Sequence, residues 1–350
     1  MKNILEPVSK IRGSWGLLRQ VLVITLAFGL VGCTDTATTG SGQNIPDPDF
    51  VIGTDQTHNK FSRAIPPAIR VPSGSVIEAF THEATGGQLN INSTVDDLAD
   101  LDMDQIHTLT GPIFVEGAEA GDVLAVELLE FEPGDWAWTA KTPDFGFLGD
   151  EIPETILKTY ELDKEANLVH FADGISIPLK PFAGVMGVAP DTDEMLSTIP
   201  PRANGGNMDD PNMVAGTTVY FPIFVEGALF SIGDTHAVQG LGEVVGTAVE
   251  APMRILLRLS VIKDRVIDEP QYETDDYFAT TGFGTTIDEA AVKATRYMIK
   301  HIADTYGLSA AEAYMLCSLI GDLKIAEVVD LPHVLVTMHI PKNAFAAPAN

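Results

Sequence analysis

The sequence predicts a β-rich α+β fold: a β-sandwich-like body of the jelly-roll type, followed by a C-terminal α+β portion. Short runs rich in β-branched residues, separated by Gly, Pro and Asp clusters, occupy the middle of the 350-residue chain. In the last third the apolar residues change to a helical period. The heptapeptide PIFVEGA occurs at 112–118 and again at 222–228, which indicates an internal repeat of two related β units; a chance match of two strand–turn elements is the alternative.

The first 32 residues have the pattern of a secretory signal peptide. Residues 1–20 carry four basic side chains against one acid, and an apolar run follows from 21 to 32. This run is too short to span a bilayer comfortably, and it ends before Cys33 in a pattern that resembles the lipobox of bacterial lipoproteins. We expect cleavage before Cys33, acylation of Cys33 and, because Thr34 follows, sorting to the outer membrane of the cell envelope. The alternative is an ordinary thiol beside an ordinary cleavage site.

Residues 33–50 are predicted to be a flexible tether, and 51–345 a single folded domain. Thr, Ser, Gly, Asp, Asn and Pro dominate the tether. A segment of this composition buries too little apolar surface to offset the entropy of ordering.

The acidity of the chain limits its partners. It contains 21 Lys and Arg against 49 Asp and Glu, a formal net charge of −28. Such a surface repels phosphate and anionic headgroups, so nucleic acid is excluded and membrane attachment must come from the lipid alone. Cys317 is the only cysteine besides Cys33, so no internal disulfide forms once Cys33 is acylated.

Strands and helices are predicted in order along the domain. The clearest strands are the β-branched runs at 75–81, 123–131, 217–225, 244–250 and 253–262. Capping boxes begin two helices, one from Thr286 to Gly307 and one from Ser309 to near Gly321. Strand-like runs at 323–329 and 333–340 close the domain.

The segment GDTHAVQGLGE, residues 233–243, is the strongest candidate for a site. Asp234 and His236 are two residues apart, so in an extended chain their side chains point to the same side. Asp, His and Glu are ligands for a zinc-type metal, and glycines let the backbone approach a ligand closely. We interpret Asp234, His236, Gln239 and Glu243 as site residues; a solvated turn is the alternative.

Other polar segments accompany this one. The loop PPRANGGN, residues 200–207, contains Arg202, Asn204 and Asn207, which suit an amide carbonyl or an oxyanion. An Asn-Gly turn is the alternative. Glu83 precedes ATGGQ and His107 lies in QIHTLTGP, and each is ambiguous on its own.

Together these segments resemble the acetamidase/formamidase family. The similarity runs from about residue 58 to the final strand, with HEATGGQ, QIHTLTGPIFVEGA, PPRANGGNMDD and GDTHAVQGLGE in order. The resemblance implies hydrolysis of short linear amides to carboxylate and ammonia, and a homo-oligomer. It also implies a divalent metal, with zinc as the first choice, held by Glu83, His107, Asp234 and His236. Glu83 departs from the pattern, since the family commonly has aspartate there.

In the mechanism we expect, the metal lowers the pKa of a bound water and polarises the amide carbonyl. Glu243 or Glu116 moves the proton from water to the leaving nitrogen. Asn204 and Asn207 are also assigned to catalysis. Arg202 and Gln239 are assigned to substrate binding. The alternative is a lipid-anchored, catalytically inactive protein that binds a small ligand and whose metal site fails at Glu83.

Overall fold

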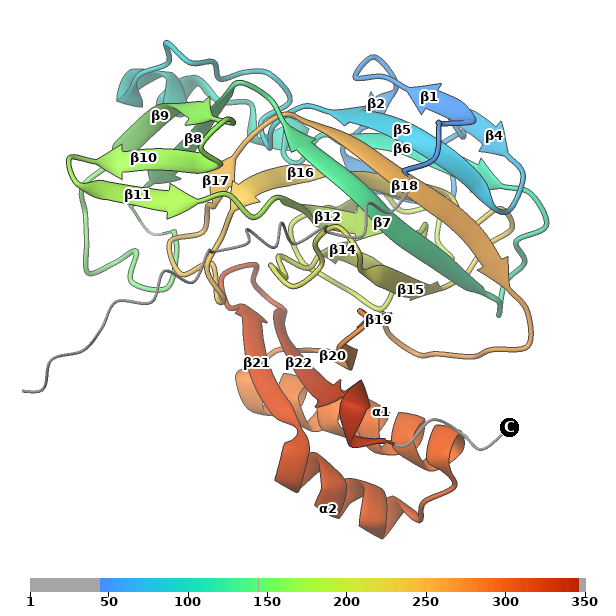
Figure 1. The fold of residues 1–350 in the computed structure, drawn as a ribbon. Helices are drawn as coiled ribbons and strands as arrows, with labels where there is room; N and C mark the ends of the chain where they lie inside the picture. The colour runs from blue at the N-terminus through green and yellow to red at the C-terminus, as the bar shows by residue number, and fades with distance from the viewer. Residues whose placement is uncertain (1–44, 144, 346–350) are drawn as a thin grey trace, which may run out of the picture. The chain divides into compact units, whose positions relative to one another are not determined.

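The computed structural model describes residues 45–143 and 145–345, which belong to one compact unit (Figure 1). The predicted signal peptide, Cys33 and most of the predicted tether lie outside these residues. Phe50, the last residue of that tether, already begins strand β1 (Phe50–Ile52). Asp49 is hydrogen-bonded to Val76 of strand β5 (Ser75–Thr81). Within the described ranges, no helix is long and apolar enough to cross a membrane.

Two large sheets form the body of the protein. The first has nine strands in the order β1-β5-β18-β7-β15-β19-β20-β22-β21, and only the β1/β5 pair is parallel. Its remaining strands are β18 (Met253–Ile262), β7 (Val123–Pro133), β15 (Thr218–Pro222), β19 (Gln271–Glu273), β20 (Tyr277–Gly284), β22 (Val334–Pro341) and β21 (Asp322–Glu327).

The second sheet has eleven strands and carries most of the candidate site. Its main path is β11-β10-β9-β8-β17-β16-β12-β14, and β6 pairs with β16, β2 and β4. These strands are β2 (Thr57–His58), β4 (Ile69–Val71), β6 (Leu109–Val115), β8 (Trp136–Lys141), β9 (Ile156–Asp163), β10 (Leu168–Ala172), β11 (Ile175–Pro178), β12 (Phe182–Gly187), β14 (Gly205–Asn207), β16 (Phe230–Val238) and β17 (Val249–Glu250). A separate ladder joins β3 (Lys60–Phe61) to β13 (Leu196–Ser197).

The main hydrophobic core lies between these sheets. Ile77 and Leu257 of the first sheet and Ile113 and Ile232 of the second are fully buried in one cluster. Figure 1 shows β7 and β18 crossing over β12 and β16. The body is therefore two layers of strands, which confirms the β-rich α+β prediction.

The two PIFVEGA copies lie side by side. The backbone N–H of Val115 donates to the carbonyl of Gly227, and the N–H of Gly227 donates to the carbonyl of Ala118. The Gly-Asp pairs that follow them differ, because Asp122 forms an ion pair with Lys263 at the surface whereas Asp234 is buried. Only the second copy therefore leads into the candidate site.

The C-terminal portion contains both predicted helices. Helix α1 (Ile287–Tyr306) begins at Thr286, whose hydroxyl accepts the N–H of Glu289, and ends at Gly307 in the left-handed conformation. Helix α2 (Ala310–Ile320) begins with a complete capping box at Ser309. The predicted helix ends are confirmed.

Helix α1 packs against strands β20 and β22 of the first sheet. Ala294, Met298 and Ile302 of α1 are buried in a cluster with residues of β20 and β22. Gly282 of β20 permits this approach, because a Cβ there would meet the carbonyl oxygen of Ala290 at 2.2 Å. Cys317 of α2 lies in the same cluster, as expected of a core residue.

Candidate active site

Strand β16 supplies the centre of the candidate site. Asp234 and His236 both lie on this strand and are almost fully buried. Asp234 has a positive φ of 48°, a strained conformation that is frequent at functional positions. Because β16 has β6, β12 and β17 as neighbours, side chains from distant parts of the chain meet beside it.

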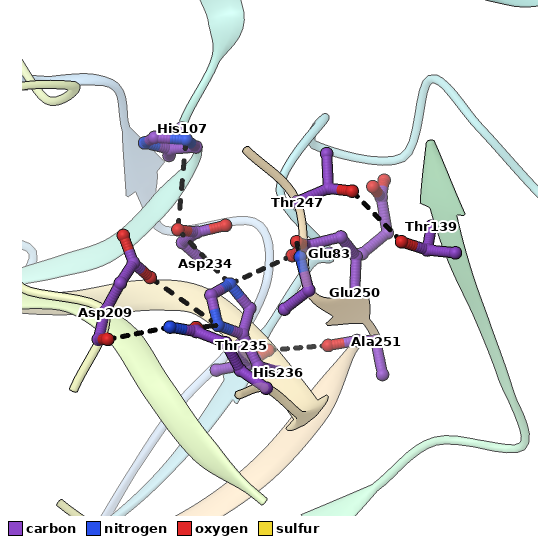
Figure 2. A network of polar contacts seen from close by, with 12 residues as sticks. Glu83, His107, Thr139, Asp209, Asp234, Thr235, His236, Thr247, Glu250 and Ala251 are labelled. Atoms are coloured by element: carbon purple, nitrogen blue, oxygen red, sulfur yellow. Dashed lines mark hydrogen bonds and ion pairs between the residues drawn. The ribbon is translucent and has the colours of Figure 1, made fainter. Parts of the chain in front are cut away.

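Three acids and two histidines converge here and form what we call the acid–imidazole cluster (Figure 2). Its members are His107, Asp209, Asp234, His236 and Glu250. His236 Nε2 lies 3.1 Å from Glu250 Oε2 and 3.6 Å from Asp234 Oδ2. His107 Nε2 lies 3.8 Å from the same Asp234 oxygen, and His236 Nδ1 lies 3.5 Å from Asp209 Oδ1. The structure thus brings the predicted residues His107, Asp234 and His236 together.

Gln239 fixes the orientation of the His236 ring. Its Nε2 donates to the carbonyl of Asp209, so its Oε1 is the atom that faces His236 Nδ1, at 2.8 Å. An amide oxygen only accepts, and Nδ1 must therefore carry the proton. In the neutral ring the lone pair is then on Nε2, which faces Asp234 and Glu250. Both polar atoms of Gln239 are engaged within the site, and its predicted role in binding substrate stays a prediction.

Buried oxygens of the cluster lack hydrogen-bond donors. Both carboxylate oxygens of Asp209 and Oε2 of Glu250 have no hydrogen-bond partner, and neither has Nδ1 of His107. Buried polar atoms are nearly always paired, so an orphaned set points to a missing cation or proton. Two triads, Asp234–His236–Glu250 and Asp209–His236–Glu243, bring potential ligand atoms within 4.8 Å of one another. Carboxylate oxygens and imidazole nitrogens fit a divalent metal of the zinc type.

Replacing Gln239 with leucine is expected to weaken metal binding about 10- to 100-fold, because groups that orient a metal ligand contribute on that scale. The ring of His236 would lose the acceptor that holds its proton on Nδ1. Titration with a competing chelator measures the affinity. Gln271→Leu is the matched control, since Gln271 accepts a hydrogen bond from Arg265. Equal affinities in the two variants would contradict the role of Gln239.

Three more buried acids lie beside the cluster. Glu243 follows β16, Glu327 ends β21 and Asp330 follows it. Burial, reinforced by Asp209, raises the pKa of Glu243 and of Asp330 well above their usual ranges. Burial also raises the pKa of Glu327 to about 8, and its Oε1 has no hydrogen-bond partner.

The charges around this centre do not balance. Within the part of the chain that the structure describes, the ion pairs of Asp209, Asp234 and Glu250 involve only the two histidines. Coulomb interaction with Glu250 and Asp234 accordingly holds the pKa of His236 well above its usual value, against the opposing effect of burial. Burying uncompensated charge costs several kcal/mol per ion. The centre therefore needs cations or bound protons beyond those that its histidines supply.

Glu83 does not join this cluster. Its carboxylate accepts hydrogen bonds from the backbone N–H groups of Thr85 and Gly87, the Thr85 hydroxyl and the Trp138 indole. Both oxygens are thus occupied by donors of the turn and of strand β8. These hydrogen bonds give Glu83 a structural role, and its predicted role as a metal ligand stays a prediction.

The Glu83→Gln variant is expected to lose about 2 to 3 kcal/mol of unfolding free energy, because an amide N–H₂ group would face donors that a carboxylate now satisfies. Urea denaturation followed by circular dichroism measures the loss. The metal content of the folded variant is expected to match that of the parent. Loss of metal without loss of stability would restore Glu83 as a ligand.

Glu116 was predicted as a proton shuttle, and the structure corrects this assignment. His107 precedes β6, whereas Glu116 follows its last residue, Val115. At roughly 3.3 Å per residue a seven-residue strand separates the two by roughly 20 Å. Glu116 is also exposed.

The loop PPRANGGN is held mainly by its own hydrogen bonds. Arg202 donates to the carbonyls of Ser197 and Pro200, and buried Asn204 donates to the carbonyl of Val188. These contacts hold the loop in place, and the predicted roles of Arg202 in substrate binding and of Asn204 in catalysis stay predictions. Asn207 is buried with Oδ1 unpaired, and its catalytic role stays a prediction.

A cavity of about 410 Å³ reaches the site from the side of strands β9 to β11. Gln239 and Glu243 form part of its wall, and most of the remaining wall is apolar. Glu243 thus lies between the acid–imidazole cluster and a space in which a small molecule fits.

A buried set of carboxylates and imidazoles that adjoins a cavity, on a β-sandwich-like body, is the arrangement of a candidate enzyme centre. Comparison with known families gives the same result. A family model described as the Acetamidase/Formamidase family matches residues 50–197 and 192–347. The chain belongs to this family.

Relatives cover most of the chain. This chain is 27% identical over 376 residues to the formamidase of Methylophilus methylotrophus, and the alignment covers 83% of this chain and 89% of that one. The crystal structure of an acetamidase from Bacillus halodurans superposes with a TM-score of 0.80 at 31% identity, covering 84% of this chain and 98% of that one. A γ-lactamase from Delftia acidovorans superposes with a TM-score of 0.60 at 25% identity, covering 83% and 90%. These comparisons confirm the predicted family and enzyme class, an amide hydrolase.

Proposed function

We propose that this protein hydrolyses small amides to carboxylate and ammonia at the acid–imidazole cluster, with the help of a divalent metal. The observation that carries the proposal is the position of His236 Nε2, which lies 3.1 Å from Glu250 Oε2 and 3.6 Å from Asp234 Oδ2, while Nδ1 on the other side of the ring faces Gln239 Oε1. His107, Asp234, His236 and Glu250 would hold the metal, with Asp209 beside them. A metal in such a site acidifies water and polarises a carbonyl, and zinc suits these ligands.

Glu243 is the acid best placed to handle protons. It lies in a triad with Asp209 and His236, and it also lines the cavity. Burial, reinforced by Asp209, raises its pKa well above that of an ordinary carboxyl group, and perturbed acids of this kind serve in general acid–base catalysis. Glu243 takes a proton from the attacking water as the C–O bond forms and gives it to nitrogen as the C–N bond breaks.

The catalytically inactive alternative loses its main support. It depended on a metal site that fails at Glu83, and the carboxylate of Glu83 is instead bound by the turn and by Trp138. The substitution of Glu for Asp at this position therefore leaves the acid–imidazole cluster intact.

Ammonia release and bound metal together test the proposed function. The purified protein is incubated with formamide, acetamide and larger amides, and its metal content is measured by mass spectrometry. We expect ammonia from at least one amide and about one metal ion or more per chain. A fully metallated protein that releases no ammonia from any of them would contradict the proposal.

The Glu243→Gln variant is expected to lower kcat about 100-fold, the lower end of the range for general acid–base catalysis, because glutamine does not accept a proton near neutrality. Metal content and KM should change little. Steady-state assays of ammonia release measure this. Glu226→Gln is the control, since Glu226 is exposed in the turn of the second PIFVEGA copy. Unchanged kcat in Glu243→Gln would assign proton transfer to another acid.

We further propose that acylated Cys33 anchors the protein in the cell envelope and that the folded unit forms a homo-oligomer. The basic and apolar segments before Cys33 and the large acidic excess support the anchor. Labelling cells with radioactive palmitate tests it: the parent protein should take up label and Cys33→Ala should not. Sedimentation equilibrium of the detergent-solubilised protein tests the oligomer.

A further inference from the structure

The cavity beside Glu243 is larger than the smallest amides require. Its volume is about 410 Å³. Acetamide has four heavy atoms and occupies on the order of 100 Å³, if each heavy atom takes roughly the 30 Å³ share of a liquid water molecule. Most of the space would remain empty around formamide or acetamide, so the cavity fits a bulkier molecule.

The wall of this cavity is apolar. Val238, Val249, Ile177 and Leu241 line it, and Phe171 adds an aromatic ring. These residues come from the ends of β16 and β17, from the loop between them, and from β10 and β11, which Figure 1 shows as a lobe beside β16 and β17. Hydrocarbon parts of a ligand gain free energy when they leave water for such a wall.

We propose that this cavity binds the acyl part of the substrate and that the preferred substrates are amides with an apolar acyl group larger than acetyl. The inference rests on the proposed function and specifies its substrate class. Continuity of the cavity with Glu243 carries it, because a substrate with its amide at Glu243 would extend its acyl group along the apolar wall.

A series of primary amides tests the preference. Formamide, acetamide, butanamide, hexanamide and benzamide are compared by kcat/KM for ammonia release, and their binding is measured in parallel by calorimetry. We expect kcat/KM to rise about fourfold per added methylene until the cavity is filled. Highest kcat/KM for formamide or acetamide, or affinity that does not depend on acyl size, would overturn the inference. Size-dependent binding without ammonia release from any amide would contradict only the proposed function.

Leu241→Trp narrows the cavity from its rim, where Leu241 is 48% exposed and a larger side chain has room. It should lower the ratio of kcat/KM for hexanamide to that for acetamide at least about fivefold, because the wall then excludes about two methylenes. A changed molecular mass in sedimentation together with an unchanged ratio would show that a second copy of the chain occupies this surface, and would overturn the inference.

Discussion

Replacing Gly184 with alanine is expected to lower kcat/KM for amide hydrolysis at least about 1,000-fold, because even a 1 Å misplacement of reacting groups costs about 100-fold and this substitution moves several of them. Gly184 lies on β12 opposite Asp234 of β16, as the flanking pairs Ala183–Thr235 and Val185–Gly233 show. An added Cβ would lie 2.3 Å from Asp209 Oδ1, 2.7 Å from His236 Cε1 and 3.0 Å from Asp234 Oδ2. Bound metal should fall with activity.

Gly53→Ala is the control for this variant. Its Cβ would meet Asp55 Oδ1 at 2.7 Å, a comparable distance, but Asp55 is an exposed side chain that is free to turn away. Steady-state ammonia release and metal content are measured for both variants. Full activity and full metal content in Gly184→Ala would contradict the geometry of the acid–imidazole cluster.

The sequence predicts local features of this protein well. The ends of α1 and α2 follow from capping residues and Gly307, because a cap is formed by side chains a few positions away. The run VVGTAVE at 244–250 was predicted as a strand, but only Val249 and Glu250 pair, in β17. Gly246 has φ of 85° and donates to the carbonyl of Glu243, so a turn interrupts this β-branched run.

The sequence predicts only part of the acid–imidazole cluster. Asp234 and His236 are two positions apart on one strand, so their common side is readable from the sequence. Asp209 and Glu250 were missed, although PPRANGGNMDD and VVGTAVE contain them. They reach the site only because β12, β14 and β17 assemble around β16, and such non-local pairing leaves no local signal.

Glu83 shows a different limit of the sequence. An acid before ATGGQ has the residue type of a ligand, but the same glycine-rich turn supplies the N–H donors that bind its carboxylate. Sequence alone does not distinguish an acid that the local backbone satisfies from one that is left for a metal.

Removal of the proposed metal is expected to lower kcat/KM about 1,000- to 10,000-fold, because a metal in such a site would supply several kcal/mol of transition-state stabilisation. Dialysis against a chelator followed by addition of zinc or manganese should remove and then restore ammonia release. The same treatment of Glu226→Gln should give the same result. Full activity in protein shown to be free of metal would contradict a metal-assisted reaction.

The metal-free protein should also become less stable as pH rises. Burial raises the pKa of Glu327 from 4.5 to about 8, so this acid contributes stability below pH 4.5 and loses it as pH rises through about 8. Asp209, Glu243, Glu250 and Asp330 have pKa values raised by burial and act in the same direction. A bound cation compensates these charges and stabilises only the folded state. The thermal unfolding midpoint of the metal-free protein should therefore be much lower at pH 8 than at pH 5, whereas the midpoints of the metal-bound protein should differ little. Equal midpoints in the metal-free protein would mean that the buried acids are compensated by other means.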